Sequence, residues 1–281
     1  MRILTSIAET RHACNLFRTA GKSLGLVPTM GALHAGHLSL IHSARESCDA
    51  VGASIFVNPT QFGPSEDFER YPRSFEQDCR LLEAAGVDFV FAPSVAEMYP
   101  AGASTFVEVA GLSDRLDGAS RPGHFRGVAT VVAKLFHIVT PDRAFFGQKD
   151  AAQVAILKKM VRDLAFPVEI RVCPIVREPD GLALSSRNQY LSREERQRAL
   201  VLSRTLNTVA ERVHAGEYES AALREEALRV LRQEPSVRLD YFAIVDPDTL
   251  EAVADLRQGA LIAVAASVGT TRLIDNFLFG G

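Results

Sequence analysis

The sequence has no tryptophan and only five tyrosines, so it offers few of the rings on which single-stranded nucleic acids stack. It also has no excess of positive charge, because 31 Lys and Arg stand against 34 Asp and Glu, a formal net charge of -3. Proteins that bind nucleic acid usually carry a basic patch or a basic overall charge. The composition therefore gives no support to a nucleic-acid partner.

Cysteine is scarce, and its four positions are widely scattered: Cys14, Cys48, Cys79 and Cys173. No C-x-x-C pair occurs, which argues against a redox motif or a zinc ribbon. A chain of 281 residues that is 47% hydrophobic can build a core without disulfides. We therefore expect reduced, mostly buried thiols, as in a cytoplasmic protein.

Long apolar runs are missing as well. The longest purely apolar stretch near the C-terminus covers residues 260–266, far fewer than the ~20 residues that span a bilayer. Near Met1 the chain carries Glu9, Arg11 and His12, which interrupt any signal-peptide core. The sequence therefore predicts a cytoplasmic protein without a membrane partner.

What the first part of the chain does contain is an alternation of apolar runs and helical patterns. Strands are predicted at residues 24–27, 50–57, 87–92, 143–146 and 168–172, and helices at 38–48, 75–85, 125–137 and 151–164. This alternation is typical of α/β proteins with a doubly wound parallel sheet. Locally, Ser74 and Gln77 suggest a capping box. Residues 105–109 suggest a short strand, and residues 118–123 a mobile surface loop.

The pattern changes near Pro174. Two helices are predicted at residues 192–214 and 221–232, the first opened by a capping box of Ser192 and Glu195. Strands follow at residues 239–245, 260–266 and 273–276. Helices first and strands afterwards predict a smaller α+β domain at residues 175–281, after a larger domain at residues 1–174.

A loop at residues 28–37 joins the first predicted strand to a helix, the place where open α/β sheets bind phosphate. It has neither P-loop nor dinucleotide-binding spacing. It carries His34 and His37 at i and i+3, so both rings can face one ligand. The residues alone leave open an ordinary pair of surface or core histidines. A metal site is less favoured because no Cys or acidic cluster stands at ligand spacing nearby.

Other polar residues follow predicted strands or stand at the domain junction. Lys149 and Asp150 open a helix, and residues 185–187 (Ser-Ser-Arg) form a polar turn that suits a phosphate clamp. Gln61 and Gln153 are placed to point into the ligand crevice of the sheet. Taken alone, each could equally be an ordinary polar residue at the protein surface. Together with the histidines they predict a nucleotide triphosphate in a cleft between two domains.

Seven motifs, in order along the whole chain, resemble those of the pantoate–β-alanine ligase family. They are PTMGALHAGH at residues 28–37, FVNPTQF at 56–62, YPR at 71–73, RPGHFRG at 121–127, FGQKD at 146–150, DGLALSSRN at 180–188 and RLIDN at 272–276. The H-x-G-H element alone is shared with nucleotidylyltransferases and is similar to the signature of class I aminoacyl-tRNA synthetases. The combination is much more specific.

The resemblance implies an ATP-dependent ligase that joins (R)-pantoate to β-alanine and releases AMP and pyrophosphate. Pantoate would attack the α-phosphate to give pantoyl adenylate, and the β-alanine amine would then displace AMP. It also implies a homodimer, a Rossmann-like domain at residues 1–174 and a C-terminal lid at residues 175–281 that shields the adenylate from water. Mg²⁺ is expected with ATP, held mainly by its phosphates, with Asp78 as a candidate protein contact and no dedicated metal site.

The resemblance also implies residue roles. His34, His37, Lys149 and Arg187 would be catalytic, with the histidines and Lys149 on the phosphates, His37 the acid, and Asp150 on the ribose. Gln61 and Gln153 would hold pantoate. The ATP site would comprise Met30, Gly31, Ala32, Leu33, His34, Ala35, Gly36, His37, Gly147, Gln148, Lys149, Asp150, Val176, Leu184, Ser185, Ser186 and Arg187.

Two alternatives remain at this point. A nucleotidylyltransferase of the same superfamily would stop at adenylyl transfer to a phosphate acceptor and would need a basic pocket for that phosphate. Gln61 and Gln153 suit a small acid with hydroxyl groups better. A non-catalytic nucleotide-binding module is the other alternative, and the intact set of His34, His37, Lys149 and Arg187 speaks against it.

Overall fold

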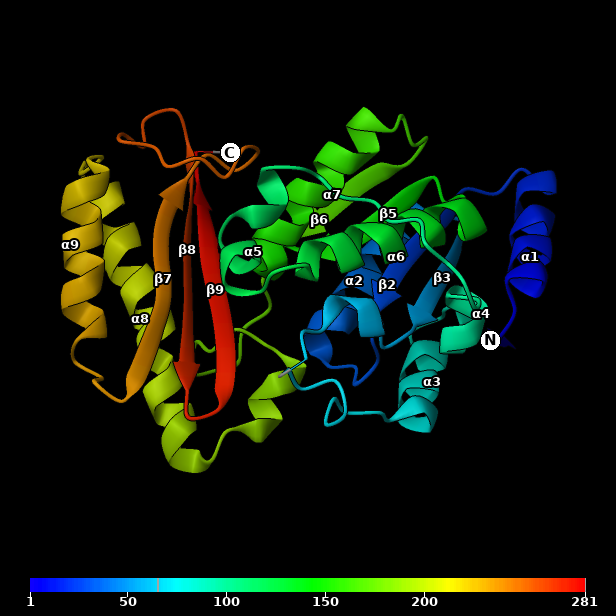
Figure 1. Ribbon diagram of the computed structural model, residues 1–281, viewed down its shortest axis with the longest axis horizontal. Coiled ribbons are helices and arrows are strands. Elements are labelled where there is room, and N and C mark those ends of the chain that lie inside the picture. Colours follow the sequence, from blue (N-terminus) through cyan, green and yellow to red (C-terminus); the bar gives the residue numbers. More distant parts are fainter. Residues whose placement is uncertain (65, 281) are drawn as a thin grey trace.

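The computed structural model describes residues 1–64 and 66–280, and within them the chain forms two separate sheets (Figure 1). The larger sheet has six parallel strands in the order β1-β4-β3-β2-β5-β6. In sequence order these are β1 (Arg2–Leu4), β2 (Leu24–Thr29), β3 (Ala50–Ile55), β4 (Phe89–Phe91), β5 (Arg143–Gly147) and β6 (Glu169–Cys173). The order reverses between β2 and β5, which makes the carboxyl ends of these two strands the expected ligand crevice.

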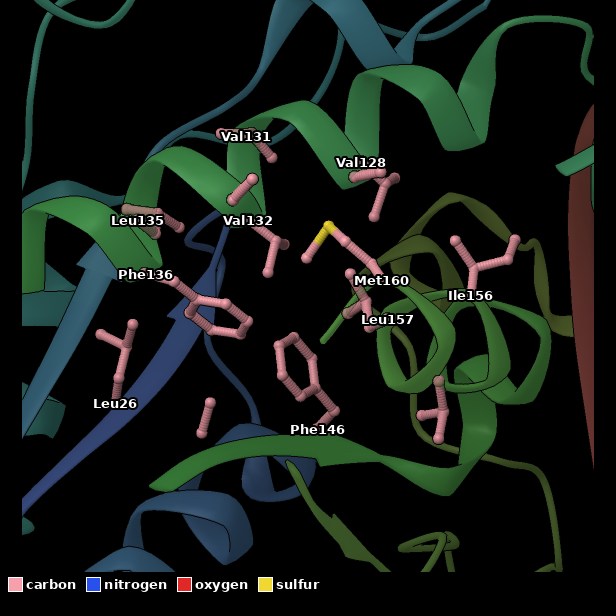
Figure 2. Packing of buried hydrophobic residues seen from close by; sticks show 14 of the residues in the cluster. Leu26, Val128, Val131, Val132, Leu135, Phe136, Phe146, Ile156, Leu157 and Met160 are labelled. Atoms are coloured by element: carbon pink, nitrogen blue, oxygen red, sulfur yellow. The ribbon is translucent and has the colours of Figure 1, made fainter. Parts of the chain in front are cut away.

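Helices cover both faces of the larger sheet. They are α1 (Ile7–Thr19), α2 (Ala35–Ser47), α3 (Phe75–Ala84), α4 (Val95–Met98), α5 (Asp117–Ser120), α6 (His124–Val139) and α7 (Ala151–Asp163). The side chains of neighbouring strand residues point to opposite faces of the sheet: Leu26 packs with α6 and α7, whereas Val27 packs with α2. Figure 2 shows the first of these cores, where Phe136 and Phe146 meet Met160. Burial on both faces explains why the strands are continuously apolar.

The smaller sheet is antiparallel, with β8 (Ala260–Val268) between β7 (Val237–Val245) and β9 (Thr271–Phe279). Two helices, α8 (Arg193–His214) and α9 (Ser220–Leu231), pack with it around a core of their own. Leu261 and Ala263 of β8 instead join the core of the larger sheet. The two sheets therefore share buried apolar contacts. Of the helices described, none is long and apolar enough to cross a bilayer.

The predicted α/β class is confirmed, and so are the predicted strands and helices other than the strand at residues 105–109, to within a few residues at their ends. The capping box of Ser192 and Glu195 is present at the start of α8. The one predicted for Ser74 and Gln77 is wrong. Ser74 stands at the N-cap of α3, but its hydroxyl donates to the Asp78 carboxylate, 3.2 Å away, rather than accepting from the helix backbone. The Ser74 hydroxyl bonds the buried Asp78 carboxylate and therefore does not cap the helix.

Two further local predictions fail. Residues 105–109 form no strand, because the Val107 amide donates to Thr130 Oγ1 on α6 (2.9 Å) and not to a neighbouring strand. Residues 118–120 belong to the short helix α5 instead of a surface loop, and Gly118 is buried. A Cβ at Gly118 would lie 1.9 Å from the Ser113 carbonyl oxygen, so this glycine serves close packing.

Candidate active site

The predicted phosphate-binding residues gather where the strand order of the larger sheet reverses. The segment from Met30 to His34 leaves the carboxyl end of β2, and a short 3₁₀ helix, η3 (Gln148–Asp150), leaves the carboxyl end of β5. A second short helix, η4 (Ser186–Tyr190), comes from the connection toward the smaller sheet. Three segments far apart in the sequence thus border one crevice.

The backbone fixes the tautomers of both histidines. His34 caps α2, and its Nδ1 accepts a hydrogen bond from the Gly36 amide (3.1 Å). His37 Nδ1 accepts from the His34 amide (3.3 Å). Because both Nδ1 atoms are acceptors, each neutral ring carries its proton on Nε2. The rings lie with centroids 4.1 Å apart, so two rings that each carry an Nε2–H donor are in contact.

Burial keeps both rings neutral in the free protein. It lowers the pKa of His34 to about 4, with the charge of Lys149 as the second cause. Burial also lowers the pKa of His37 to about 3, assisted by His34 and Lys149. The two histidines are therefore hydrogen-bond donors at neutral pH, and His37 is not a cationic acid before a ligand binds.

A buried carboxylate holds the loop before these histidines. Asp78 on α3 is 1% exposed, and it accepts hydrogen bonds from the amides of Ala32 and Leu33, both at 2.9 Å. The loop bends through positive φ at Gly31 (83°) and Ala32 (51°). Asp78 was expected as a candidate metal contact, but both of its oxygens are directed at loop amides. The structure thus gives it a supporting role that the sequence did not reveal.

Gly36 shows why the motif needs glycine between its histidines. A Cβ at this position would lie 2.9 Å from the His34 ring, closer than real contacts allow. Any other residue would push His34 away from the N-terminus of α2. Lys149 Nζ lies 3.5 Å from Asp150 Oδ1, and its charge acts on both histidines.

Arg187 on η4 reaches the crevice through an ion pair. Its guanidinium donates two hydrogen bonds of 2.9 Å to the Asp67 carboxylate and lies 5.8 Å from the centre of the Tyr71 ring. Tyr71 in turn contacts the Ser186 hydroxyl (3.2 Å). Burial alone would raise the pKa of Asp67, but the hydrogen bonds and charge of Arg187 lower it below its ordinary value. Both groups are therefore charged and paired.

Gln61 is held by its neighbours. Its Nε2 donates to Met30 Sδ (3.0 Å), and its Oε1 accepts from Asn58 (3.1 Å). The Gln61 carbonyl lies 2.7 Å from His124 Nδ1, and Arg121 Nη1 lies 2.9 Å from His124 Nε2. Since the carbonyl can only accept, His124 donates from Nδ1 and accepts from Arg121. Burial, with Arg121, lowers the pKa of His124 to about 4.

Three adjoining cavities connect these groups. One of about 180 Å³ is lined by Met30, His37 and Gln61, and one of about 70 Å³ by Lys149 and Ser185. Five residues line both: Arg121, His124, Asp150, Gln153 and Arg187. A third cavity of about 630 Å³ is bordered by His34, Leu33, Leu184, Ser185 and Ser186. The third cavity shares Ser185 with the second, so most of the predicted phosphate, ribose and pantoate residues line three neighbouring cavities, which we call the cleft.

Some predicted residues stand behind the cleft rather than in it. Six residues predicted for the ATP site do not line these three cavities: Gly31, Ala35, Gly36, Gly147, Gln148 and Val176. The Gln148 side chain donates to Asn276 on β9 (3.0 Å), and the Val176 carbonyl accepts from the Leu184 amide (3.0 Å). Asp67 was missed by the sequence, because only its contact with Arg187, 120 residues away, reveals it. Asn58, Arg121, His124 and Asn276 were present in family motifs but received no role.

Comparison with known proteins shows which family the chain resembles. The model of the family described as pantoate-beta-alanine ligase matches residues 2–278. The chain is 62% identical to the pantothenate synthetase of Acidobacterium capsulatum, over 100% of this chain and 97% of that protein. It is 58% identical to that of Koribacter versatilis, over 99% and 96%.

Solved structures agree with this placement. The pantothenate synthetase of Thermus thermophilus superimposes with a TM-score of 0.94 at 50% identity, covering 99% of both chains. A pantoate-beta-alanine ligase from Francisella tularensis, complexed with beta-gamma ATP and beta-alanine, superimposes with a TM-score of 0.81 at 35% identity, over 99% of this chain and 97% of that one. The chain therefore belongs to the pantoate–β-alanine ligase family.

Proposed function

We propose that the cleft between β2, β5 and η4 is where this ligase condenses (R)-pantoate with β-alanine at the expense of ATP. The observation that carries the proposal is the pair of neutral Nε2–H donors of His34 and His37, beside the ammonium of Lys149. Donors preorganised in a partly buried site stabilise charge that develops in a transition state. Phosphoryl and adenylyl transfer depend mainly on such stabilisation.

In the first step a pantoate carboxylate oxygen attacks the α-phosphorus, and the bond to pyrophosphate breaks. His34 and His37 would donate to phosphate oxygens, and Lys149 would offset the added negative charge. Arg187 would bind the departing phosphates as a planar, two-pronged donor. In the second step the β-alanine amine attacks the acyl carbon, AMP leaves, and the amine loses a proton. Activation is needed because a free carboxylate is a poor acyl donor.

Pantoate would occupy the cavity of about 180 Å³, with its carboxylate toward the α-phosphate. Gln61 and Gln153 line this cavity and can bond hydroxyl and carboxylate oxygens without adding charge. Asn58 supports the orientation of Gln61 by donating to its Oε1. The five residues shared with the neighbouring cavity would bring the β-alanine amine close to the acyl carbon.

Mg²⁺ would enter with ATP. No cluster of three or more His, Cys, Asp or Glu suited to a metal occurs among residues 1–64 and 66–280. Asp78 is occupied by loop amides, whereas Asp150 borders the cleft beside Lys149. This donor set suits an ion held mainly by nucleotide phosphates, as the family resemblance implies. When bound, the ion would supply charge neutralisation on the phosphates.

The remaining expectations belong to the same proposal. Residues 1–174 would bind ATP and pantoate, and residues 175–281 would cover the cleft and exclude water from the adenylate. A homodimer and a cytoplasmic location are supported by the family resemblance. Light scattering of the purified protein tests the dimer.

The test of the function is an assay with ATP, Mg²⁺, pantoate and β-alanine. The ligase forms AMP only when both acids are present, and it exchanges labelled pyrophosphate into ATP with pantoate alone. Exchange without pantoate, or adenylyl transfer to a phosphate acceptor, would support the nucleotidylyltransferase alternative. ATP binding without any turnover would support the non-catalytic module.

A further inference from the structure

Asn276 ties the smaller sheet to the turn that carries Lys149. It lies on β9, the edge strand of that sheet (red in Figure 1), and is 3% exposed. Its Nδ2 donates to the carbonyls of Gln148 (3.1 Å) and Lys149 (2.9 Å). Its Oδ1 accepts from Gln148 Nε2 (3.0 Å). One side chain therefore makes three hydrogen bonds to η3 from a strand far along the chain.

The chemistry of these bonds requires an amide. Only Asn or Gln offers two N–H donors and a carbonyl acceptor on one planar group. A carboxylate would face two carbonyl oxygens with no donor, and an aliphatic side chain would satisfy none of the three groups. The preceding Gly147 provides no side-chain cap for η3, whereas Asn276 bonds two of its carbonyls from outside.

The residue before Asn276 supports the opposite wall of the cleft. Asp275, also 3% exposed, accepts two hydrogen bonds from Arg177, at 2.7 and 2.9 Å. Arg177 also donates to the Gly181 carbonyl (3.0 Å) and forms a β-bridge with Ala183. This hairpin leads directly into the segment that carries Ser185 and Arg187. Two adjacent residues of β9 therefore anchor both cationic elements of the cleft.

We propose that Asn276 is a positioning residue for adenylation: by clamping the backbone of η3, it holds the ammonium of Lys149 at the α-phosphate. This inference rests on the proposed function, which places Lys149 on the nucleotide. A displacement of about 1 Å in such a group can slow a reaction about 100-fold. Asn276 itself lines none of the three cavities of the cleft, so it acts only through Lys149 and its turn.

The experiment is a double-mutant cycle on pantoate-dependent pyrophosphate exchange. Asn276→Asp keeps the size and the acceptor but removes both donors, and we expect kcat to fall about 10- to 100-fold, with a smaller change in the KM for pantoate. In the Lys149→Ala background, Asn276→Asp should have no further effect, because its partner in the reaction is gone. A purely structural role would slow both backgrounds equally.

A stability control separates positioning from general loosening of the sheet. Ile262→Val alters a fully buried residue of β8 that packs with α8 and α9. It should lower the melting temperature without changing kcat. If Asn276→Asp does not fold, Asn276→Ser, which keeps one small donor, takes its place in the cycle.

The outcomes distinguish the inference from the proposed function. Unchanged exchange in Asn276→Asp, or equal slowing with and without Lys149, would overturn the inference while leaving the function standing. Unchanged exchange in Lys149→Ala would instead remove Lys149 from the proposed mechanism. A slow Lys149→Ala variant in which Asn276→Asp adds nothing supports both.

Discussion

At the residue scale, the amides of Gly36 and His34 donate to the Nδ1 atoms of His34 and His37, so Nε2 is the only donor left to each neutral ring. Spacing in the sequence suggested that both rings face one ligand, which their centroid distance of 4.1 Å supports. The sequence could not reveal the tautomers, because these depend on the turn that Asp78 holds in place.

Replacements of His37 separate its two nitrogens. His37→Asn puts a carbonyl oxygen near the position of Nδ1, so the bond from the His34 amide is retained while the Nε2–H donor is lost. We expect an unchanged melting temperature and an adenylation rate lower by about 10²–10³. His37→Gln extends an amide donor toward the position of Nε2 and should recover part of that rate. Single-turnover measurements with ATP and pantoate test the pair of variants.

The two His37 variants can also show that the role assigned to His37 is wrong. If His37→Asn adenylates pantoate at the wild-type rate, the Nε2–H donor has no part in the first step. A loss of pantoate affinity with an unchanged rate would place His37 on the acid instead of the phosphate. Isothermal titration of pantoate in both variants distinguishes these cases.

Buried neutral histidines also make stability depend on pH. The pKa of His34 and of His124 is lowered to about 4, and that of His37 to about 3, against about 6.5 in the unfolded chain. Between these values the unfolded state binds more protons, so the free energy of unfolding falls as the pH falls below about 6.5. Each histidine contributes about 1.4 kcal/mol per pH unit in this window.

Urea unfolding at pH 7, 6 and 5 measures this dependence. Above pH 5 the carboxylates contribute little, since their unfolded pKa values lie near 4. His37→Asn should reduce the slope by about 1.4 kcal/mol per pH unit, the share of one proton. An unchanged slope would mean that His37 is protonated in the folded protein, contrary to its burial.

At the scale of elements, the sequence predicted most of what hydrophobic periodicity controls. The runs at β2, β3 and β5 are buried on both faces and therefore read as apolar strands. The errors arose where a hydrogen bond involving a side chain overrides a local pattern, over four residues in one case and 23 in the other. Asp78 draws the Ser74 hydroxyl away from its cap, and Thr130 binds the Val107 amide that a strand would have used. Such contacts are visible only in the folded chain.

The same reason limited the prediction of the site. Polar residues at strand ends, such as Gln61 and Lys149, could be located from the topology of a parallel sheet. Their supporting residues could not, because Asn276 reaches η3 from a strand 127 residues further along the chain. Asp67 likewise lies 120 residues from Arg187. No spacing rule relates such pairs.

The ion pair of Arg187 with Asp67 should compete with the binding of ATP. If Arg187 binds the departing phosphates, it must loosen its bonds to Asp67 when ATP enters. Asp67→Asn removes the competing charge and nearly preserves the shape. We expect the free protein to become less stable, because a largely buried guanidinium loses its partner. ATP should bind more tightly, by about tenfold for each 1.4 kcal/mol of relieved competition.

Calorimetric titration of ATP and melting without ATP measure the two effects. Glu226→Gln is the matched control, since it removes a carboxylate from an ion pair with Arg229 on α9, and neither residue lines the cleft. That variant should change neither quantity appreciably. Weaker ATP binding in Asp67→Asn would show that Asp67 assists the nucleotide rather than competing with it.

At the scale of the whole molecule, the proposed boundary at residue 174 divides the chain by topology but not by packing. Val245, Leu250, Leu261 and Ala263 lie beyond the boundary yet belong to the core of the larger sheet. Arg272 on β9 pairs with Asp117 (2.6 Å), and Arg115 pairs with Glu251 (2.8 Å). The smaller sheet is therefore joined to the larger one by apolar and charged contacts. A closing motion that kept these contacts would have to come from the loops around Asp67 and Arg187.

This packing predicts that the chain unfolds as one cooperative unit. Leu261 is 1% exposed and lies on β8 while packing into the core of the larger sheet. Leu261→Ala should cost about 2–5 kcal/mol, the usual range for a buried leucine. The loss should appear as a single calorimetric transition at lower temperature, with faster amide exchange in α6 and α7 as well as in β8.

Ile262→Ala is the matched variant, because the side chain of Ile262 packs in the core of the smaller sheet. It should lower the melting temperature of the same transition. Two separate transitions, of which Leu261→Ala moves only one, would mean that residues 1–174 and 175–281 are independent domains, and a lid that swings as a rigid body would then be the better description of closure.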